Sequence, residues 1–177
     1  MFGTLDNWQT IARKLAQNFM VYIIDLRNHG KSPHSDEFDY AVMAQDILNF
    51  MEQNWIYKAH IIGHSMGGKV AMALACDMPD MVDKLIVVDI VPKAYKGNHG
   101  PIFDALFALD LDTVDNRKTA DTFLQSRIED FGVRQFILKI LHINKETGKY
   151  EWKMNLPVIH TAYKHILGKS ELNEVFD

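Results

Sequence analysis

Cysteine is almost absent from this sequence, where Cys76 is the one cysteine among 177 residues. A single cysteine excludes a framework of disulfides within the chain and a zinc site built from several thiolates. Long apolar runs are also lacking, since none approaches the roughly 20 residues that a membrane-spanning helix requires. The first residues show no basic stretch followed by an apolar one, so we expect no secretory signal there. These absences favour a cytoplasmic protein.

An excess of charge of one sign is missing as well. The 19 Lys and Arg residues and the 23 Asp and Glu residues leave a net charge of -4. This balance provides no basic surface, so we expect no nucleic-acid partner. Hydrophobic residues make up 47% of the chain and charged residues 24%. Such a composition is typical of a globular domain and excludes a disordered tail.

Short apolar runs alternate with helical patterns over the first half of the chain. Three runs rich in β-branched residues predict buried strands at Met20–Leu26, Ala59–Gly63 and Leu85–Ile90. Apolar residues recur at helical spacing after Asp6, over Tyr40–Met51 and over Val70–Cys76. Apolar strands that alternate with helices predict a parallel sheet in an α/β fold. In such a fold the functional residues lie at the carboxyl ends of the strands.

Helical patterns dominate after Pro92. They cover Phe103–Leu111, Thr119–Ile128, Phe131–Leu141 and Val158–Leu167, while Tyr150–Met154 alternates like a short strand. A helical block that follows an α/β half is typical of a cap inserted over the strand ends. We therefore expect a partial α/β core in residues 1–92 and a mainly helical cap or lid region in residues 93–177.

The segment Gly63-His64-Ser65-Met66-Gly67-Gly68 is the most specific motif. It matches the pattern G-x-S-x-G and lies where that pattern requires, after a strand and at the start of a helix. A turn of this kind exposes the serine hydroxyl at the positive end of the helix. We therefore predict that Ser65 is a nucleophile and that the backbone N–H of Met66 is one donor of an oxyanion hole.

Two other interpretations of this motif stay open at this point. The glycines could form a simple turn between a strand and a helix. Residues 63–69 also match G-x-x-x-x-G-K, which would make the protein a P-loop nucleotide-binding protein with Asp89 on its Walker B strand. The P-loop interpretation has one weakness, because Val70 stands where a Ser or Thr should bind magnesium.

A serine hydrolase also needs an acid and a histidine base. Asp89 ends the third predicted strand and is the predicted triad acid, with a turn or helix cap as its alternative role. Asp25 also ends a strand, but the neighbouring Arg27 suggests a structural ion pair. The histidines are His29, His34, His60, His64, His99, His142, His160 and His165. None follows a strand-like run after Asp89, where the order nucleophile, acid, histidine requires the base, so we expect the triad histidine to lie outside this chain.

Three segments together resemble the α/β-hydrolase superfamily. They are Asp25–Pro33 (DLRNHGKSP), Gly63–Lys69 (GHSMGGK) and Asp83–Pro92 (DKLIVVDIVP). The resemblance is closest to the esterase branch that includes bacterial YbfF and animal abhydrolase-domain-containing protein eleven. Through Val133–Lys139 and Tyr150–Pro157 it extends over essentially the whole chain.

The resemblance implies hydrolysis of carboxylic esters, with thioesters as a further class, by Ser65 and Asp89 and without a metal or an organic cofactor. It also implies a partial α/β-hydrolase fold that lacks the N-terminal and the C-terminal strands of the family. The family's oxyanion loop reads His-Gly-x-Phe-Gly, and Met1-Phe2-Gly3 resembles its end. Met1 is therefore the candidate for the second oxyanion donor.

The leading hypothesis is a serine hydrolase that acts on a small-molecule ester or thioester through an acyl-enzyme. This chain would be an incomplete part of it, with little or no activity of its own. The alternative is a non-catalytic α/β-hydrolase-like module that binds a partner or a small ligand, which the missing histidine favours. The sequence gives no indication of oligomeric state.

Overall fold

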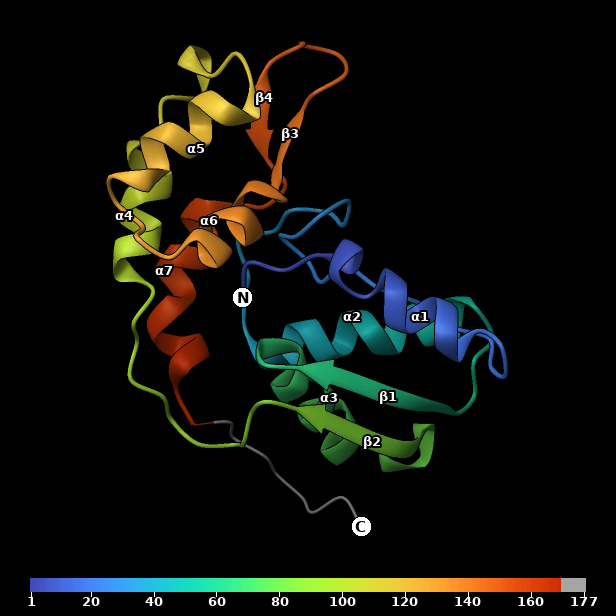
Figure 1. Cartoon of the computed structure of the whole chain (residues 1–177). Helices are drawn as coiled ribbons and strands as arrows, with labels where there is room; N and C mark the ends of the chain where they lie inside the picture. The colour runs from blue at the N-terminus through green and yellow to red at the C-terminus, as the bar shows by residue number, and fades with distance from the viewer. Residues whose placement is uncertain (170–177) are drawn as a thin grey trace. The chain divides into compact units, whose positions relative to one another are not determined.

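The computed structural model describes residues 1–169, which form two compact units (Figure 1). The first unit holds Met1, residues 35–96 and the chain from Thr161 onward, and the second unit holds residues 2–34 and 97–160. This grouping differs from the predicted division at residue 92, because the N-terminal segment makes contacts with the later helical block. The backbone N–H of Asn155, for example, donates to the carbonyl oxygen of Asn28 at 2.9 Å.

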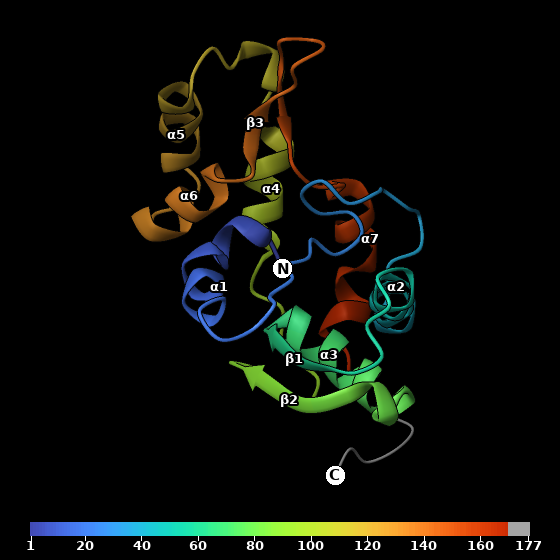
Figure 2. The same cartoon turned by 90° about the vertical axis from the view of Figure 1, so that its right-hand side faces the viewer.

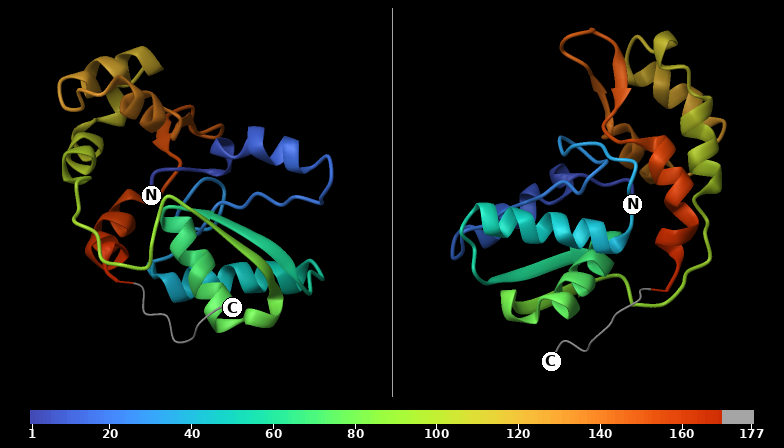
Figure 3. Two further views of the ribbon diagram at one scale, coloured as in Figure 1. Left: turned by 60° about the horizontal axis from the view of Figure 1, so that its bottom comes forward. Right: turned by 180° about the vertical axis from the view of Figure 1, so that it is seen from behind.

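A two-stranded parallel sheet is the centre of the first unit (Figures 2 and 3). Strand β1 (Ala59–His64) pairs with β2 (Val82–Val88). Helix α3 (Met66–Asp77) and the short 3-10 turn η2 (Pro79–Met81) connect the two strands. Helix α3 packs against both strands, and α2 (Tyr40–Gln53) packs against α3. Helix α3 therefore covers one face of the sheet, and α2 lies against α3.

The residues of α2 and α3 explain where these helices begin and how deeply they are buried. Helix α2 starts after Asp39, whose carboxylate accepts a hydrogen bond from the N–H of Val42 at 2.9 Å and so caps the helix. In α3 every residue from Val70 to Cys76 is buried, in keeping with its Ala, Met and Leu content. The helix ends at Asp77, shortly before Pro79, which could not continue it.

Two glycines lie where helix α3 packs too closely for a side chain, Gly63 against α3 itself and Gly68 against the residue Ile90 that follows β2. A Cβ atom on Gly63 would lie 2.2 Å from the carbonyl oxygen of Gly67, and one on Gly68 would lie 2.5 Å from Cγ2 of Ile90. Gly67, by contrast, has open space where its Cβ would stand. The close packing therefore depends on Gly63 and Gly68, whereas Gly67, the second glycine of the G-x-S-x-G pattern, is not needed for it.

The prediction of a buried strand over Met20–Leu26 is wrong. The segment has no strand assignment, and Met20 and Ile24 are exposed. A strand needs a neighbour that takes up its backbone hydrogen bonds, and within residues 1–169 no β-strand pairs with this segment. The segment Met20–Leu26 thus has the amino-acid composition of a buried strand but no strand partner.

The other two predicted strands are confirmed, but they are not buried on both faces. Ile62, Ile86 and Val88 are 37%, 44% and 41% exposed. They lie on the face of the sheet that α3 does not cover, since side chains alternate between the two faces of a strand. The described first unit therefore has a half-covered sheet, where the sequence predicted a fully buried one.

The second unit is mainly helical. Its elements are η1 (Leu5–Asn7), α1 (Gln9–Leu15), α4 (Gly100–Ala108), η3 (Leu111–Thr113), α5 (Arg117–Gln125), α6 (Phe131–Leu138) and the antiparallel pair β3 (Leu141–Ile143) and β4 (Tyr150–Trp152). Buried Arg134 holds the start of α6 to α5, with Nε 3.0 Å from the carboxylate of Asp121. Helix α7 (Leu156–Leu167) begins in the second unit and ends in the first.

Each predicted helical segment of the second half contains a helix, but three of these helices end earlier than predicted. Helix α4 ends at Ala108, α5 at Gln125 and α6 at Leu138, and Leu141 begins β3. None of the helices in residues 1–169 combines the length and the apolar character needed to cross a membrane.

We predict that Gly63→Ala destabilises the protein far more than Gly67→Ala. The methyl group at position 63 has to displace the backbone of Gly67, which should cost about 2 kcal/mol or more. At position 67 the methyl group enters open space within a helix, so the free energy of unfolding should stay the same or rise by about 0.5–1 kcal/mol. Chemical denaturation followed by circular dichroism gives both values, and equal losses would contradict the described packing.

Candidate functional site

Ser65 stands between β1 and α3 in a strained backbone conformation. Its φ of 52° and ψ of -121° lie in a region that residues other than glycine rarely adopt. The N–H of Ser65 donates to the carbonyl oxygen of Val88 at 2.9 Å, and its own carbonyl oxygen accepts from the N–H of Gly68 at 2.8 Å. These two bonds hold the turn, and strain of this kind is found mainly at functional sites.

Asp89 directly follows β2 and also has a positive φ, of 56°. Its side chain is 85% exposed, with Oδ2 3.7 Å from Nε2 of His64. An exposed pair of this kind contributes little to stability. Because Ser65 is hydrogen-bonded to Val88, the residue before Asp89, the structure brings the predicted nucleophile and the predicted acid to neighbouring strand ends.

Met66 is the first residue of α3 and is buried. Backbone N–H groups in the first turn of a helix have no carbonyl partner within the helix, and the helix dipole makes this end favourable for anions. The N–H of Met66, the residue after Ser65, therefore has the chemistry that an oxyanion donor needs.

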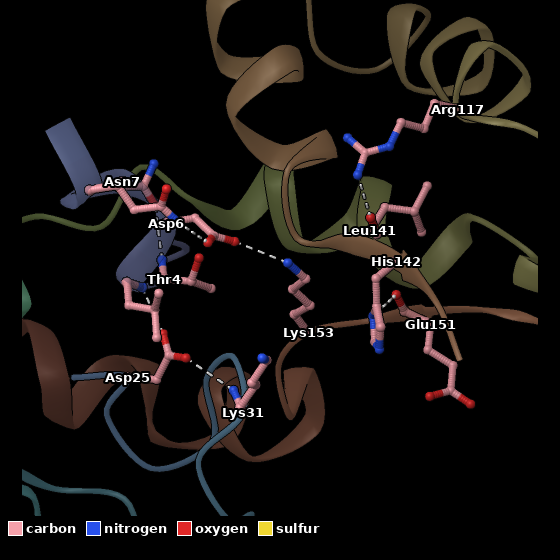
Figure 4. A network of polar contacts seen from close by, with 12 residues as sticks. Thr4, Asp6, Asn7, Asp25, Lys31, Arg117, Leu141, His142, Glu151 and Lys153 are labelled. Atoms are coloured by element: carbon pink, nitrogen blue, oxygen red, sulfur yellow. Dashed lines mark hydrogen bonds and ion pairs between the residues drawn. The ribbon is translucent and has the colours of Figure 1, made fainter. Parts of the chain in front are cut away.

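Asp25 anchors the N-terminal segment of the second unit (Figure 4). Its buried carboxylate accepts hydrogen bonds from the N–H of Leu5 at 2.7 Å and of Lys31 at 3.1 Å. The predicted ion pair with Arg27 is thus wrong, because backbone amides take its place. Sequence reasoning missed this role, since a backbone amide twenty residues away leaves no signal in the side chains.

Met1, the other predicted oxyanion donor, is half-buried. The residue that follows it, Phe2, is buried and packs edge-on against Phe103 at 5.1 Å between ring centroids. The residues after Met1 are therefore well anchored within the second unit. The assignment of Met1 itself as a donor stays a prediction.

Several histidines make structural contacts. His29 and His142 each place Nδ1 beside a backbone carbonyl oxygen, at 2.9 Å and 3.0 Å, and the ring of His160 packs on Phe103. His60 Nδ1 lies 2.9 Å from the carboxylate of Asp83. Each of these four side chains therefore has a structural partner among the described residues. The absence of a triad histidine from this chain stays a prediction.

The P-loop interpretation of Gly63–Lys69 is wrong. The lysine of a P-loop must reach the phosphates of the nucleotide. Lys69 is only 1% exposed, and its Nζ donates to the carbonyl oxygens of Lys93 at 3.0 Å and Gly168 at 2.6 Å. Elsewhere, too, the described residues bring no three His, Cys, Asp or Glu side chains together in a way that could hold a metal ion.

Comparisons with known proteins match most of the chain. A family model described as alpha/beta hydrolase fold matches residues 1–140. The chain is 38% identical over 169 residues to Esterase YbfF of Escherichia coli (strain K12), which covers 95% of this chain and 64% of that protein. It is 36% identical over 185 residues to sn-1-specific diacylglycerol lipase ABHD11 of Danio rerio, which covers 100% of this chain and 58% of that protein. The chain thus spans less than two thirds of the length of both curated relatives.

The solved structure of a marine microorganism esterase superimposes on the chain with a TM-score of 0.91 at 39% identity. The match covers 96% of this chain and 67% of that structure. Because the family model and this structural match both cover most of the residues, the chain belongs to the α/β-hydrolase fold family.

Proposed function

We propose that this chain is the nucleophile-bearing part of a hydrolase that acts on carboxylic esters, with thioesters as a further class. The observation that carries the proposal is the strained turn of Ser65, hydrogen-bonded to the strand end that leads to Asp89. The names of the relatives, an esterase and a diacylglycerol lipase, support an ester as the substrate.

In the proposed mechanism the hydroxyl of Ser65 attacks the carbonyl carbon of the ester. The N–H of Met66 stabilises the oxyanion of the tetrahedral intermediate, together with a second donor near Met1. Loss of the alcohol leaves an acyl group on Ser65, and water then releases the acid. A histidine takes the serine proton and gives it to the leaving alcohol. It then takes a proton from the attacking water and returns it to Ser65, while the carboxylate of Asp89 orients that histidine.

We place this histidine outside the chain. The carboxylate of Asp89 is 85% exposed, and its contact with His64 is long, at 3.7 Å, so it has room to accept a hydrogen bond from another imidazole. The curated relatives are long enough to supply one, since the chain covers only 64% and 58% of them. The chain on its own should therefore have little activity.

A second candidate is a non-catalytic module that binds a small apolar ligand. It is favoured by an open groove in the second unit, with a volume of about 430 Å³. Its walls are mostly apolar and include Leu106, Trp152 and Met154. The volume lies within the range of small-molecule sites, so a ligand could occupy this groove without being hydrolysed.

We predict that the isolated chain hydrolyses 4-nitrophenyl butyrate no faster than its Ser65→Ala variant. Members of a triad act as a unit, and removal of the histidine alone lowers kcat by about 10⁶-fold in one protease. Stopped-flow measurement of 4-nitrophenol release tests this. A burst from the unmodified chain that is lost in Ser65→Ala would show that the chain contains its own base.

We further predict that adding the segments of E. coli YbfF that lie outside the match restores hydrolysis. In this extended protein, Ser65→Ala should lower kcat by about 10⁴-fold or more and Asp89→Asn by about 10³-fold or more. Asp83→Asn is the matched control, because it removes the corresponding contact with a β1 histidine at the other end of the sheet. It should leave kcat unchanged.

The same extended protein separates the two candidate functions. A folded extended protein without hydrolysis would overturn the ester hydrolase. The binding module would be favoured instead if this extended protein and its Ser65→Ala variant bound an apolar fluorescent ligand with the same affinity.

A further inference from the structure

Lys69 carries a charge that is almost completely removed from water. It lies one helical turn after Ser65 on α3 and is 1% exposed. The Nζ atom donates to the carbonyl oxygens of Lys93 and Gly168, at 3.0 Å and 2.6 Å. No carboxylate of the described residues forms an ion pair with it. Burial accordingly lowers the pKa of this ammonium group.

Two aromatic rings complete the surroundings of the Lys69 ammonium. The rings of Tyr40 and Tyr95 lie 5.5 Å and 5.4 Å from Nζ, measured to the ring centroids. Both distances are within the range of a cation–π interaction. The ammonium is therefore stabilised by two carbonyl dipoles and two aromatic rings in place of a negative charge.

Three of the four groups around Lys69, all except the Tyr40 ring of α2, come from the two segments through which residues 97–160 are attached to the first unit. The chain leaves the first unit after Lys96 and returns at Thr161. Lys93 and Tyr95 belong to the departing segment, and Gly168 directly follows α7 on the returning one. Both attachments are thus bound to the same ammonium, which is held by the helix that follows Ser65.

Direct hydrogen bonds also join these elements to one another. The N–H of Tyr95 donates to the carbonyl oxygen of Leu167 at 2.8 Å, and the hydroxyl of Tyr40 on α2 donates to the carbonyl oxygen of Ile166 at 2.6 Å. Three successive carbonyl groups at the end of α7, those of Ile166, Leu167 and Gly168, therefore have partners from three different parts of the first unit.

The buried ammonium of Lys69 needs both of its carbonyl acceptors, one on the departing segment and one on the returning segment. A buried cation without a carboxylate is stable only where other groups replace its hydration. The last carbonyls of α7 carry the negative end of the helix dipole, which suits a cation. If either attachment moved away, the ammonium would lose one of its two acceptors while still buried. The charge of Lys69 therefore holds the departing and the returning segment together.

We propose that Lys69 is a positioning residue that fixes both attachments of residues 97–160 to the helix carrying the nucleophile turn. The proposal rests on the proposed function to the extent that residues 97–160 are the cap of an ester hydrolase. In that role Lys69 touches no reacting atom, and it acts on how well the substrate is bound rather than on the chemical step.

Hydrogen exchange measured by mass spectrometry tests the proposal on the chain itself. The variant is Lys69→Met, which keeps the length and removes the charge, and the matched control is Lys84→Met, at an exposed position of β2. The amides of Tyr95 and Gly168 should exchange about tenfold faster or more in Lys69→Met, because hydrogen bonds to a charged group are lost nearby. Unchanged exchange at both amides, or a uniform increase over α2, α3 and β1, would overturn the proposal.

A second variant keeps the test decisive if Lys69→Met does not fold. Tyr40→Phe retains the ring beside the ammonium and removes only the hydroxyl that donates to Ile166. Faster exchange confined to the end of α7 and to the segment of Tyr95 is the expected result. If the amides at the end of α7 and near Tyr95 exchanged at the same rate in Tyr40→Phe as in Lys84→Met, the result would count against the proposal.

Kinetics of the extended protein separate positioning from a purely structural role. We expect Lys69→Met to raise KM for 4-nitrophenyl butyrate about tenfold and to leave kcat within about twofold. A fall in kcat with KM unchanged would overturn the positioning role. If neither the extended protein nor its Lys84→Met variant hydrolysed the ester, the proposed function would fail, while the exchange experiment would still decide on Lys69.

Discussion

The hydrogen bond from the N–H of Ser65 to the carbonyl oxygen of Val88 is the contact on which the candidate site depends. It continues the parallel pairing of β1 and β2 beyond the last residue of β1. Ser65 and Asp89, which both have positive φ angles, are thereby held at adjacent strand ends. Strained residues of this kind cost about 1–3 kcal/mol each and persist only where their surroundings hold them. Here the bond to Val88 and the close packing at Gly63 and Gly68 do so.

Much of this arrangement could be predicted from the sequence, because local patterns specify it. The apolar run of β1, the small residues around Ser65 and the helical spacing that follows all lie within twenty residues. The position of Asp89 follows from the end of the next apolar run. Each of these features rests on backbone preferences or on side-chain periodicity, which a single sequence displays directly.

The features that could not be predicted depend on residues far apart in the chain. Met20–Leu26 has the composition of a buried strand, but composition does not reveal whether a neighbouring strand is present. Asp25 accepts from the backbone of Leu5, and a backbone amide is the same at every position. Lys69 resembled the lysine of a phosphate-binding loop, but its ammonium is buried against the carbonyl oxygens of Lys93 and Gly168, which follow 24 and 99 residues later.

Helix α7 belongs to both units, with Leu156–His160 in the second and Thr161–Leu167 in the first. One residue more or less in a helix turns everything beyond it by about 100° and shifts it by about 1.5 Å. A change in the length of α7 would therefore displace the residues at its end, which include the carbonyl oxygen of Gly168 at the Lys69 ammonium, whereas a change in the hairpin loop at residues 144–149 would not. Among related chains, insertions and deletions should therefore occur mainly in such loops. The number of residues in α7 should be the same in all of them.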